Sequence, residues 1–195
     1  MDFPKTARGI SNQITRTRKY FSDYKREYGG FHDSNGSRYY LFYLCFLLGD
    51  NRRSSEYLRW YEKNFPDDIG EPVQLLCWAL IVHRMGKNAE KRLAEAMLSN
   101  IYLIPVILGD KIAKVDMWHS SNYEAPEYLD YFPDRIKAEI TSEDKKWIES
   151  CYISDKFQGL LKRHIDINNQ LKNLSIGEER NNLVRELSYL LDDFE

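Results

Sequence analysis

The pattern of apolar and polar positions predicts helices separated by turns that contain glycine. Residues 39–48, YYLFYLCFLL, form an uninterrupted apolar and aromatic run that ends at Gly49. A run of this length is too short to span a bilayer, for which about 20 residues are needed. A buried strand is the alternative, because aromatic residues are common in strands. No alternation of apolar and polar positions is visible, however, and a glycine is typical of a helix end, so the pattern favours a buried helix.

A second, amphipathic helix is predicted over residues 54–64. Tyr57, Leu58 and Tyr61 recur at helical spacing on one side of it, and Pro66 follows its end. A fully apolar helix, a short turn and an amphipathic helix together predict a helical hairpin.

The hairpin pattern occurs a second time. Pro72 opens an apolar helix over residues 73–86, and the amphipathic segment 88–100 follows it. The turn glycines Gly49 and Gly86 lie 37 residues apart. A period in the thirties that is built from a pair of helices indicates a helical solenoid.

The two helix pairs, over residues 38–108, resemble degenerate tetratricopeptide repeats. The positions that carry the resemblance are Leu41, Leu48, Gly49, Ser54 and Pro66 in the first pair, and Trp78, Ala79, Met85 and Gly86 in the second. Pro105 comes two residues late for the closing proline of the second repeat. The resemblance implies an all-α fold of antiparallel helical hairpins, arranged as a short α-solenoid.

Proteins of the tetratricopeptide family bind extended peptides or partner helices on the concave face that their first helices line. The resemblance therefore implies a protein or peptide partner, with Tyr39, Tyr43, His83 and Arg84 as partner-binding residues. The Lys and Asn clamp that the family uses for a C-terminal carboxylate is missing from the corresponding positions. The groove implied by the resemblance is accordingly apolar and aromatic.

Helices are also predicted on both sides of the two pairs. An N-terminal amphipathic helix lies within residues 1–30, and C-terminal helices occupy residues 122–195. Residues 122–140 and 141–152 predict two short helices, and Thr141 with Asp144 resembles a capping pair at the start of the second. Between these parts, the apolar residues 101–108 form a short packed segment.

The end of the chain predicts an antiparallel helical hairpin. Apolar positions recur at alternating steps of four and three residues on either side of Ser175, which with Glu178 has the spacing of a capping box. The first helix contributes Leu160, His164, Ile167, Leu171 and Leu174, and the second contributes Leu183, Leu187, Leu190 and Phe194. We expect this hairpin to pack on its own domain, with self-association along the seam as the alternative.

Composition indicates a globular protein. The chain has 195 residues, of which 43% are hydrophobic and 30% charged, and this suits a single all-helical domain over residues 1–195. The net charge of −2 provides no overall field for nucleic acid or for anionic lipid. The sequence says nothing about the oligomeric state.

Charge is nevertheless unevenly distributed. The start of the chain is basic and its last twenty residues are acidic. The basic residues are Lys5, Arg8, Arg16, Arg18, Lys19, Lys25 and Arg26, and the acidic ones are Glu178, Glu179, Glu186, Asp192, Asp193 and Glu195. A basic helix could bind RNA, a membrane surface or the chain's own acidic end, although a solvated helix face is the commoner role.

Cysteine usage and the N-terminus bear on location. The chain has three cysteines, Cys45, Cys77 and Cys151, which is an odd number, and they lack the spacing of a zinc site. We therefore expect buried free thiols in a reducing compartment. The first ten residues lack the apolar core of a signal peptide, and no apolar run is long enough for a membrane helix. These observations predict a cytoplasmic protein without membrane segments.

No catalytic motif, cofactor loop or metal-ligand spacing is present, so we expect neither an enzyme nor a bound metal or cofactor. Residues 108–121 are the exception, because they collect Asp110, Asp116, His119 and Ser120. A solvated connection is the simpler interpretation, and an enzyme that uses Asp116 and His119 is the alternative.

The function that this pattern favours is a non-enzymatic protein-interaction module. A more specific version is a bacterial immunity or antitoxin protein that neutralises a toxin by direct binding, since the chain is small, mildly acidic and rich in tyrosine. The alternative from another class is RNA or DNA binding through the basic N-terminal helix. We expect nucleic acid less, because the aromatic residues recur with leucines at core spacing rather than with basic residues.

Overall fold

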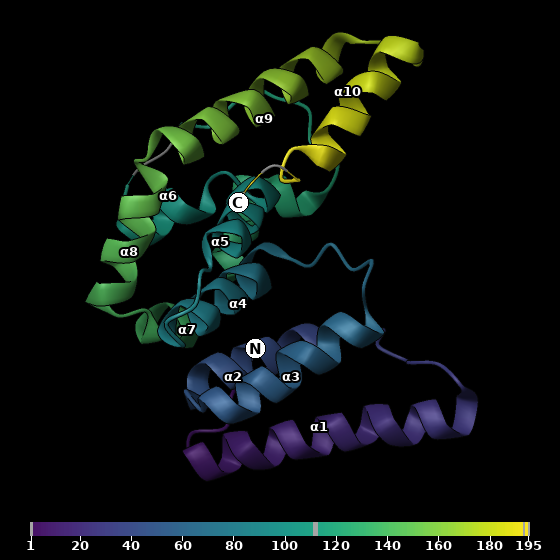
Figure 1. Cartoon of the computed structure of the whole chain (residues 1–195), viewed down its shortest axis with the longest axis vertical. Coiled ribbons are helices and arrows are strands. Elements are labelled where there is room, and N and C mark those ends of the chain that lie inside the picture. Colours follow the sequence, from purple (N-terminus) through teal and green to yellow (C-terminus); the bar gives the residue numbers. More distant parts are fainter. Residues whose placement is uncertain (1, 111–112, 193, 195) are drawn as a thin grey trace. The chain divides into compact units, whose positions relative to one another are not determined.

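A computed structural model describes residues 2–110, 113–192 and 194, so that the acidic positions Asp193 and Glu195 lie outside the described residues. Over this range the regular structure consists of ten α-helices and two short 3-10 helices, without a strand (Figure 1). The all-α fold class is therefore confirmed, while the solenoid arrangement stays a prediction. The chain divides into two compact units, Met1–Lys87 and Asn88–Glu195.

The first unit is built around α2. Its helices are α1 (Ala7–Tyr28), α2 (Ser37–Leu48), α3 (Asn51–Asn64) and α4 (Pro72–Arg84). Helix α2 packs against α1, α3 and α4, and thus has neighbours on several sides (Figure 1). This central position explains why α2 is apolar almost all round.

The apolar run that forms α2 is a buried helix, as the sequence predicts. Residues 41–46 are all buried, and Gly49 ends the helix at a φ of 65°, where its N–H donates to the carbonyl of Cys45. A left-handed residue at this position favours glycine because a Cβ would be strained there. Asp50 then begins α3, and its carboxylate accepts a hydrogen bond from the N–H of Arg53 (3.0 Å).

Aromatic side chains fill the core of the first unit. The ring of Phe42 lies 4.8 Å from that of Tyr61 and 5.1 Å from that of Trp78, measured between centroids. Tyr57 and Phe21 are also fully buried. Such pairs contribute about 0.5–1.5 kcal/mol each beyond the area they bury. The aromatic residues of α2, α3 and α4 that form these pairs are thus core, whereas Tyr20 and Tyr28 of α1 are exposed.

The second unit is organised around its longest helix, α9. Its α-helices are α5 (Glu90–Ser99), α6 (Leu103–Leu108), α7 (Asp134–Glu139), α8 (Ser142–Tyr152), α9 (Asp155–Asn173) and α10 (Glu178–Tyr189). Helix α9 packs against α5, α8 and α10, and α6 packs against α5 and α8. Helix α10 returns alongside α9 in the opposite direction, as the predicted hairpin requires (Figure 1).

Two predictions about helix starts have different outcomes. The capping pair at Thr141 is confirmed, because its backbone N–H donates to Asp144 (2.8 Å) and its hydroxyl accepts from the N–H of Asp144 (3.1 Å). The capping box at Ser175 is wrong. Gly177 occupies the N-cap position of α10 without a side-chain hydrogen bond, so Ser175 lies two residues too early to cap the helix.

The predicted helix over residues 122–140 is also wrong in detail. This segment forms 3-10 helices at Asn122–Glu124 and Pro126–Tyr131, followed by the short α7. Proline at positions 126 and 133 lacks an N–H donor, and a continuous α-helix cannot run through both.

Candidate functional site

Of the two tyrosines of the predicted aromatic groove, Tyr43 is buried and Tyr39 is partly exposed. Tyr43 is 4% exposed, and its ring meets that of Phe3 edge-on, with centroids 6.3 Å apart. Tyr39 is half-buried and donates a hydrogen bond to Oδ1 of Asp68 (2.6 Å). Both residues therefore have structural contacts, and their role in partner binding stays a prediction.

His83 and Arg84, the other two predicted partner-binding residues, lie at the end of α4 and are half-buried. The guanidinium carbon of Arg84 lies over the Phe46 ring, 4.4 Å from its centroid. His83 precedes Arg84 in the last turn, where a cationic group is favoured by the helix dipole. The structure thus brings Arg84 onto the aromatic α2 and leaves its use by a partner untested.

Arg38 links the segments before α2 and after α3. Its guanidinium group donates to Asp33 (2.7 Å) and to Asp68, and its carbonyl accepts from the hydroxyl of Tyr57. Burial opposes ionisation of the Asp68 carboxyl, but hydrogen bonds from Tyr39 and Arg38 outweigh it and hold its pKa below the ordinary value. Burial, followed by the hydrogen bond to Asp68, raises the pKa of Tyr39. Arg38, whose pKa is raised, and Asp68 therefore form a charged pair at neutral pH.

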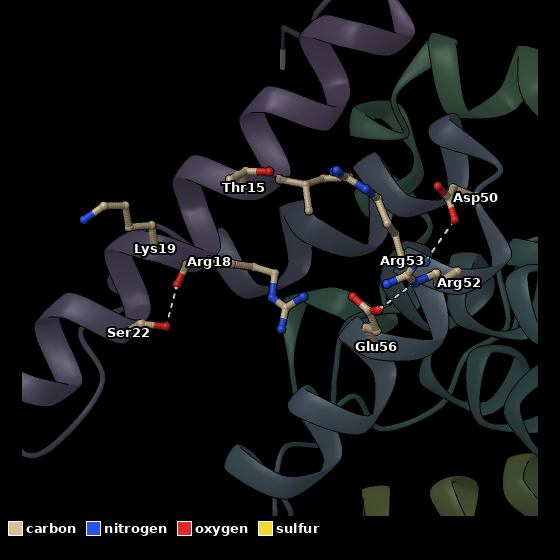
Figure 2. A pocket seen from close by; sticks show the side chains of 9 residues that line it. Thr15, Arg18, Lys19, Ser22, Asp50, Arg52, Arg53 and Glu56 are labelled. Atoms are coloured by element: carbon tan, nitrogen blue, oxygen red, sulfur yellow. Dashed lines mark hydrogen bonds and ion pairs between the residues drawn. The ribbon is translucent and has the colours of Figure 1, made fainter.

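A separate groove lies between α1 and α3 in the same unit (Figure 2). It encloses about 520 Å³. Four basic and two acidic side chains line it together with smaller residues: Arg18, Lys19, Arg52, Arg53, Asp50, Glu56, Ile14, Thr15 and Ser22. The groove is therefore polar and carries an excess of positive charge.

Short side chains on α1 leave room for this groove. The hydroxyls of Thr15 and Ser22 donate to backbone carbonyls four residues earlier in α1, each at 3.0 Å, so they lie close to their own helix. Arg18 projects from α1 toward α3, and Arg53 projects from α3 toward α1 (Figure 2). Two guanidinium groups therefore enter the groove from opposite walls.

These two arginines differ from the other basic side chains nearby. Arg52 pairs with Glu56 (3.2 Å), and Lys19 pairs with Asp23 (2.6 Å). Arg18 and Arg53 are half-buried, and within the described residues neither forms an ion pair with a carboxylate. The Nη1 atom of Arg53 donates to the carbonyl of Ser11 at 3.3 Å, which uses one of its five donors.

Sequence reasoning identified only one wall of this groove. It included Arg18 and Lys19 among the basic residues of the N-terminal helix, but not Arg52 or Arg53. A signal was present, because Asp50 starts α3 and both arginines therefore fall in its first turn. The positive end of the helix dipole disfavours cations at that position. Arg52 offsets this effect by pairing with Glu56 one turn later, whereas Arg53 has no ion pair among the described residues.

In the described part of the segment 108–121, the residues of the enzyme alternative have structural partners, and their use in catalysis stays a prediction. Asp116 pairs with Lys172 (2.5 Å), and the Ser120 hydroxyl donates to Glu124. Nδ1 of His119 lies 3.7 Å from the same carboxylate. The serine hydroxyl therefore faces an acid rather than an imidazole that could remove its proton. In addition, the described residues contain no group of three or more acidic, histidine or cysteine side chains that could hold a metal ion.

All three thiols are free and buried, as the sequence predicts. Burial raises the pKa of Cys45 to about 12 and that of Cys151 to about 11. Burial also raises the pKa of Cys77 well above its usual value. Because the thiolate is the reactive form, these cysteines are poor nucleophiles.

Comparison with known proteins gives no relative. No family model, curated protein or solved structure matches this chain. None of the described helices is both long and apolar enough to cross a bilayer.

Proposed function

We propose that the protein is a non-enzymatic binding module that holds an acidic segment of a partner protein in the groove between α1 and α3. The observation that carries this proposal is the pair of half-buried arginines, Arg18 and Arg53, which enter the groove from opposite helices (Figure 2). Removing a guanidinium group from water is costly unless an anion replaces the lost hydration. A carboxylate does so through two parallel hydrogen bonds.

The other charges of the groove favour a peptide over a nucleic acid. Asp50 and Glu56 lie on the α3 wall and would repel a continuous phosphate backbone. A protein segment can present an acidic residue to the arginines and a basic or polar residue to these carboxylates. Tyr57 and Tyr61 of α3 are buried and cannot stack on bases, although Tyr20 and Tyr28 of α1 are exposed.

The proposal keeps the class of function that the sequence favours and assigns the binding site to a different surface. The predicted site used Tyr39 and Tyr43, whose rings are engaged within the first unit. The charged side chains of the groove are exposed or half-buried, so a partner can reach them without disturbing the core.

The proposal is tested with a fluorescein-labelled peptide of alternating Glu and Gly, titrated with the full chain at low and at high salt. We expect binding that weakens with salt and that falls about tenfold or more in the double variant Arg18→Gln, Arg53→Gln. Hydrogen bonds to charged groups contribute about 1.5–3 kcal/mol each, and tenfold corresponds to about 1.4 kcal/mol.

The matched control is the double variant Arg16→Gln, Arg59→Gln. It removes the same charge from the same two helices at exposed positions outside the groove, and should bind the peptide nearly as the wild type does. An equal loss in both double variants would show that only net charge matters. Tighter binding of a uridine oligonucleotide than of the peptide would overturn the choice of a protein partner.

A further inference from the structure

A stripe of tyrosines, Tyr20, Tyr24 and Tyr28, runs along α1 at steps of four residues. The helix packs on α2 with the face that carries Ile14 and Phe21 (Figure 1). Two of the three tyrosines face solvent, since 46% of Tyr20 and 64% of Tyr28 is exposed. Tyrosine is enriched at protein interfaces, so an exposed row of such rings on one helix indicates a binding surface.

The rings of this tyrosine stripe are ordered against one another. The ring centroids of Tyr20 and Tyr24 lie 6.0 Å apart, and those of Tyr24 and Tyr28 lie 4.5 Å apart. The ring of His32 stacks on Tyr24 with centroids 5.4 Å apart, and its Nδ1 atom lies 3.1 Å from the hydroxyl of Tyr20. Side chains that are already held in place lose little conformational entropy when a partner binds. The stripe is therefore preformed.

A charge of each sign accompanies the tyrosine stripe, one toward each end. Arg16 precedes Tyr20 by four residues and Glu27 follows Tyr24 by three, so both lie on the face of α1 that carries the rings. Both side chains are exposed, and neither forms an ion pair within the described part of the chain. The stripe thus has a basic end and an acidic end.

The other charges next to the stripe are satisfied within α1. Lys19 and Arg26 both pair with Asp23, at 2.6 and 2.9 Å. Arg16 and Glu27 are therefore the charges that select a partner for the stripe.

The order of these two charges is self-complementary. In an antiparallel pair of α1 helices with a two-fold axis between positions 21 and 22, Arg16 of each copy faces Glu27 of the other. The same arrangement places Tyr20 of each copy beside Tyr24 of the other. The rings then pack in the middle of the interface, and the two ion pairs lie on either side of them.

We propose that the tyrosine stripe of α1 binds the same stripe of a second copy of this chain, in antiparallel orientation, through stacked tyrosines and two ion pairs between Arg16 and Glu27. A nucleic acid fits this surface less well, because Glu27 repels phosphate. One helix face is smaller than the interface of a permanent dimer, so the association depends on protein concentration. The stripe shares no residue with the lining of the α1–α3 groove.

Sedimentation velocity of the full chain over a wide range of concentrations tests the proposal, and we expect a reversible equilibrium between monomer and dimer. Arg16→Glu should weaken the dimer about tenfold, because two like-charge contacts then replace two ion pairs. Arg8→Glu is the matched control, since it makes the same charge change at an exposed position of α1 outside the stripe. A monomer at all concentrations, or an equal loss in both variants, would show that the proposal is wrong.

Exchange of the charges tests the antiparallel pairing. A mixture of the Arg16→Glu chain and the Glu27→Arg chain should form more dimer than either chain alone, because opposite charges meet only in the mixed dimer. The variant that carries both substitutions should dimerise as the wild type does. If neither the mixture nor this double variant restores the dimer, the two charges do not face each other and the proposal is overturned.

Two further variants separate this surface from the other candidates. Tyr20→Ala should weaken the dimer several-fold, and the Arg18→Gln, Arg53→Gln variant should dimerise as the wild type does, because its substitutions lie in the groove. A chain that stays monomeric and binds a uridine oligonucleotide through Tyr20 would show that the stripe serves a nucleic acid instead of a second copy.

Discussion

His164 lies on the inner side of α9 with 8% of its surface exposed, and its Nε2 atom has no hydrogen-bond partner among the described residues. Burial, followed by the electrostatic effect of the nearby His119, lowers the pKa of the imidazole to about 4. The backbone carbonyl of His164 accepts from the side chain of Asn168, one turn later in α9 (2.9 Å). The folded state therefore favours the neutral imidazole at neutral pH.

Because of His164, we expect the free energy of unfolding to fall when the pH is lowered. The unfolded chain protonates His164 near pH 6.5, whereas the folded chain protonates it only near pH 4. Between these values the unfolded state binds more protons, so the stability present above pH 6.5 falls as pH is lowered. The loss reaches at most about 3 kcal/mol, since one pKa unit corresponds to about 1.4 kcal/mol. Urea unfolding of wild type and His164→Gln at several pH values measures it.

The variant should flatten the pH dependence of the free energy of unfolding over this window. His32→Gln is the control, because His32 is exposed and belongs to the first unit. A wild-type slope in His164→Gln would mean that other groups cause the acid sensitivity.

At the scale of the helix, α9 and α10 make unequal contributions to the second unit. Five residues of α9 are buried, while α10 has no buried residue. An ion pair between Arg163 and Glu186 (2.5 Å) joins the two helices, and both partners are partly exposed. Exposed pairs of this kind contribute about 0–1 kcal/mol. The hairpin therefore depends chiefly on α9.

The second prediction compares one residue type on the two helices. Leu171→Ala, on α9, removes a side chain that is 1% exposed, and we expect a loss of about 2–5 kcal/mol. Leu187→Ala, on α10, affects a half-buried side chain and should cost less than about 1 kcal/mol. Thermal unfolding followed by circular dichroism measures both. Similar losses would show that α10 is as firmly packed as α9.

At the scale of the whole molecule, the division into two units falls between α4 and α5, inside the region that resembles two repeats. Each unit has its own buried side chains, with Phe42 in the first and Ile148 in the second, both at 0% exposure. The prediction of a single domain over residues 1–195 stays a prediction, and whether the two units unfold together can be measured directly.

We expect the two units to unfold separately. Phe42→Ala should cost about 3–5 kcal/mol in the first unit. We expect it to accelerate amide hydrogen exchange over residues 2–87 and to leave protection over the second unit unchanged. Ile148→Ala should show the reverse pattern. If either variant lowers protection evenly along the chain, the two units unfold as one domain.

The sequence was sufficient to predict the helices whose pattern is local. The apolar run of α2, its glycine stop and the proline start of α4 each depend on neighbouring residues, and all three are confirmed. The start of α10 was wrong because a serine and a glutamate at capping spacing are also compatible with an extended chain, and Gly177 adopts that conformation.

The candidate groove could be predicted only in part, because its walls are distant in the sequence. Helical spacing gives the face of α1 that carries Arg18, but nothing local indicates that α3 approaches this face. The burial of Tyr43 likewise depends on Phe3, which precedes it by forty residues. Contacts of this kind are set by tertiary packing, which the pattern along one segment does not contain.

The buried thiols have a practical consequence. Cys45 and Cys77 belong to the first unit and Cys151 to the second. A thiol-specific reagent reacts only when the surrounding structure opens, because burial both covers the sulfur and suppresses its ionised form. Under native conditions, the rate at which each cysteine is alkylated therefore reports the opening of its own unit. The wild-type protein thus contains its own chemical probes of local stability, one set for each unit, and needs no engineered label.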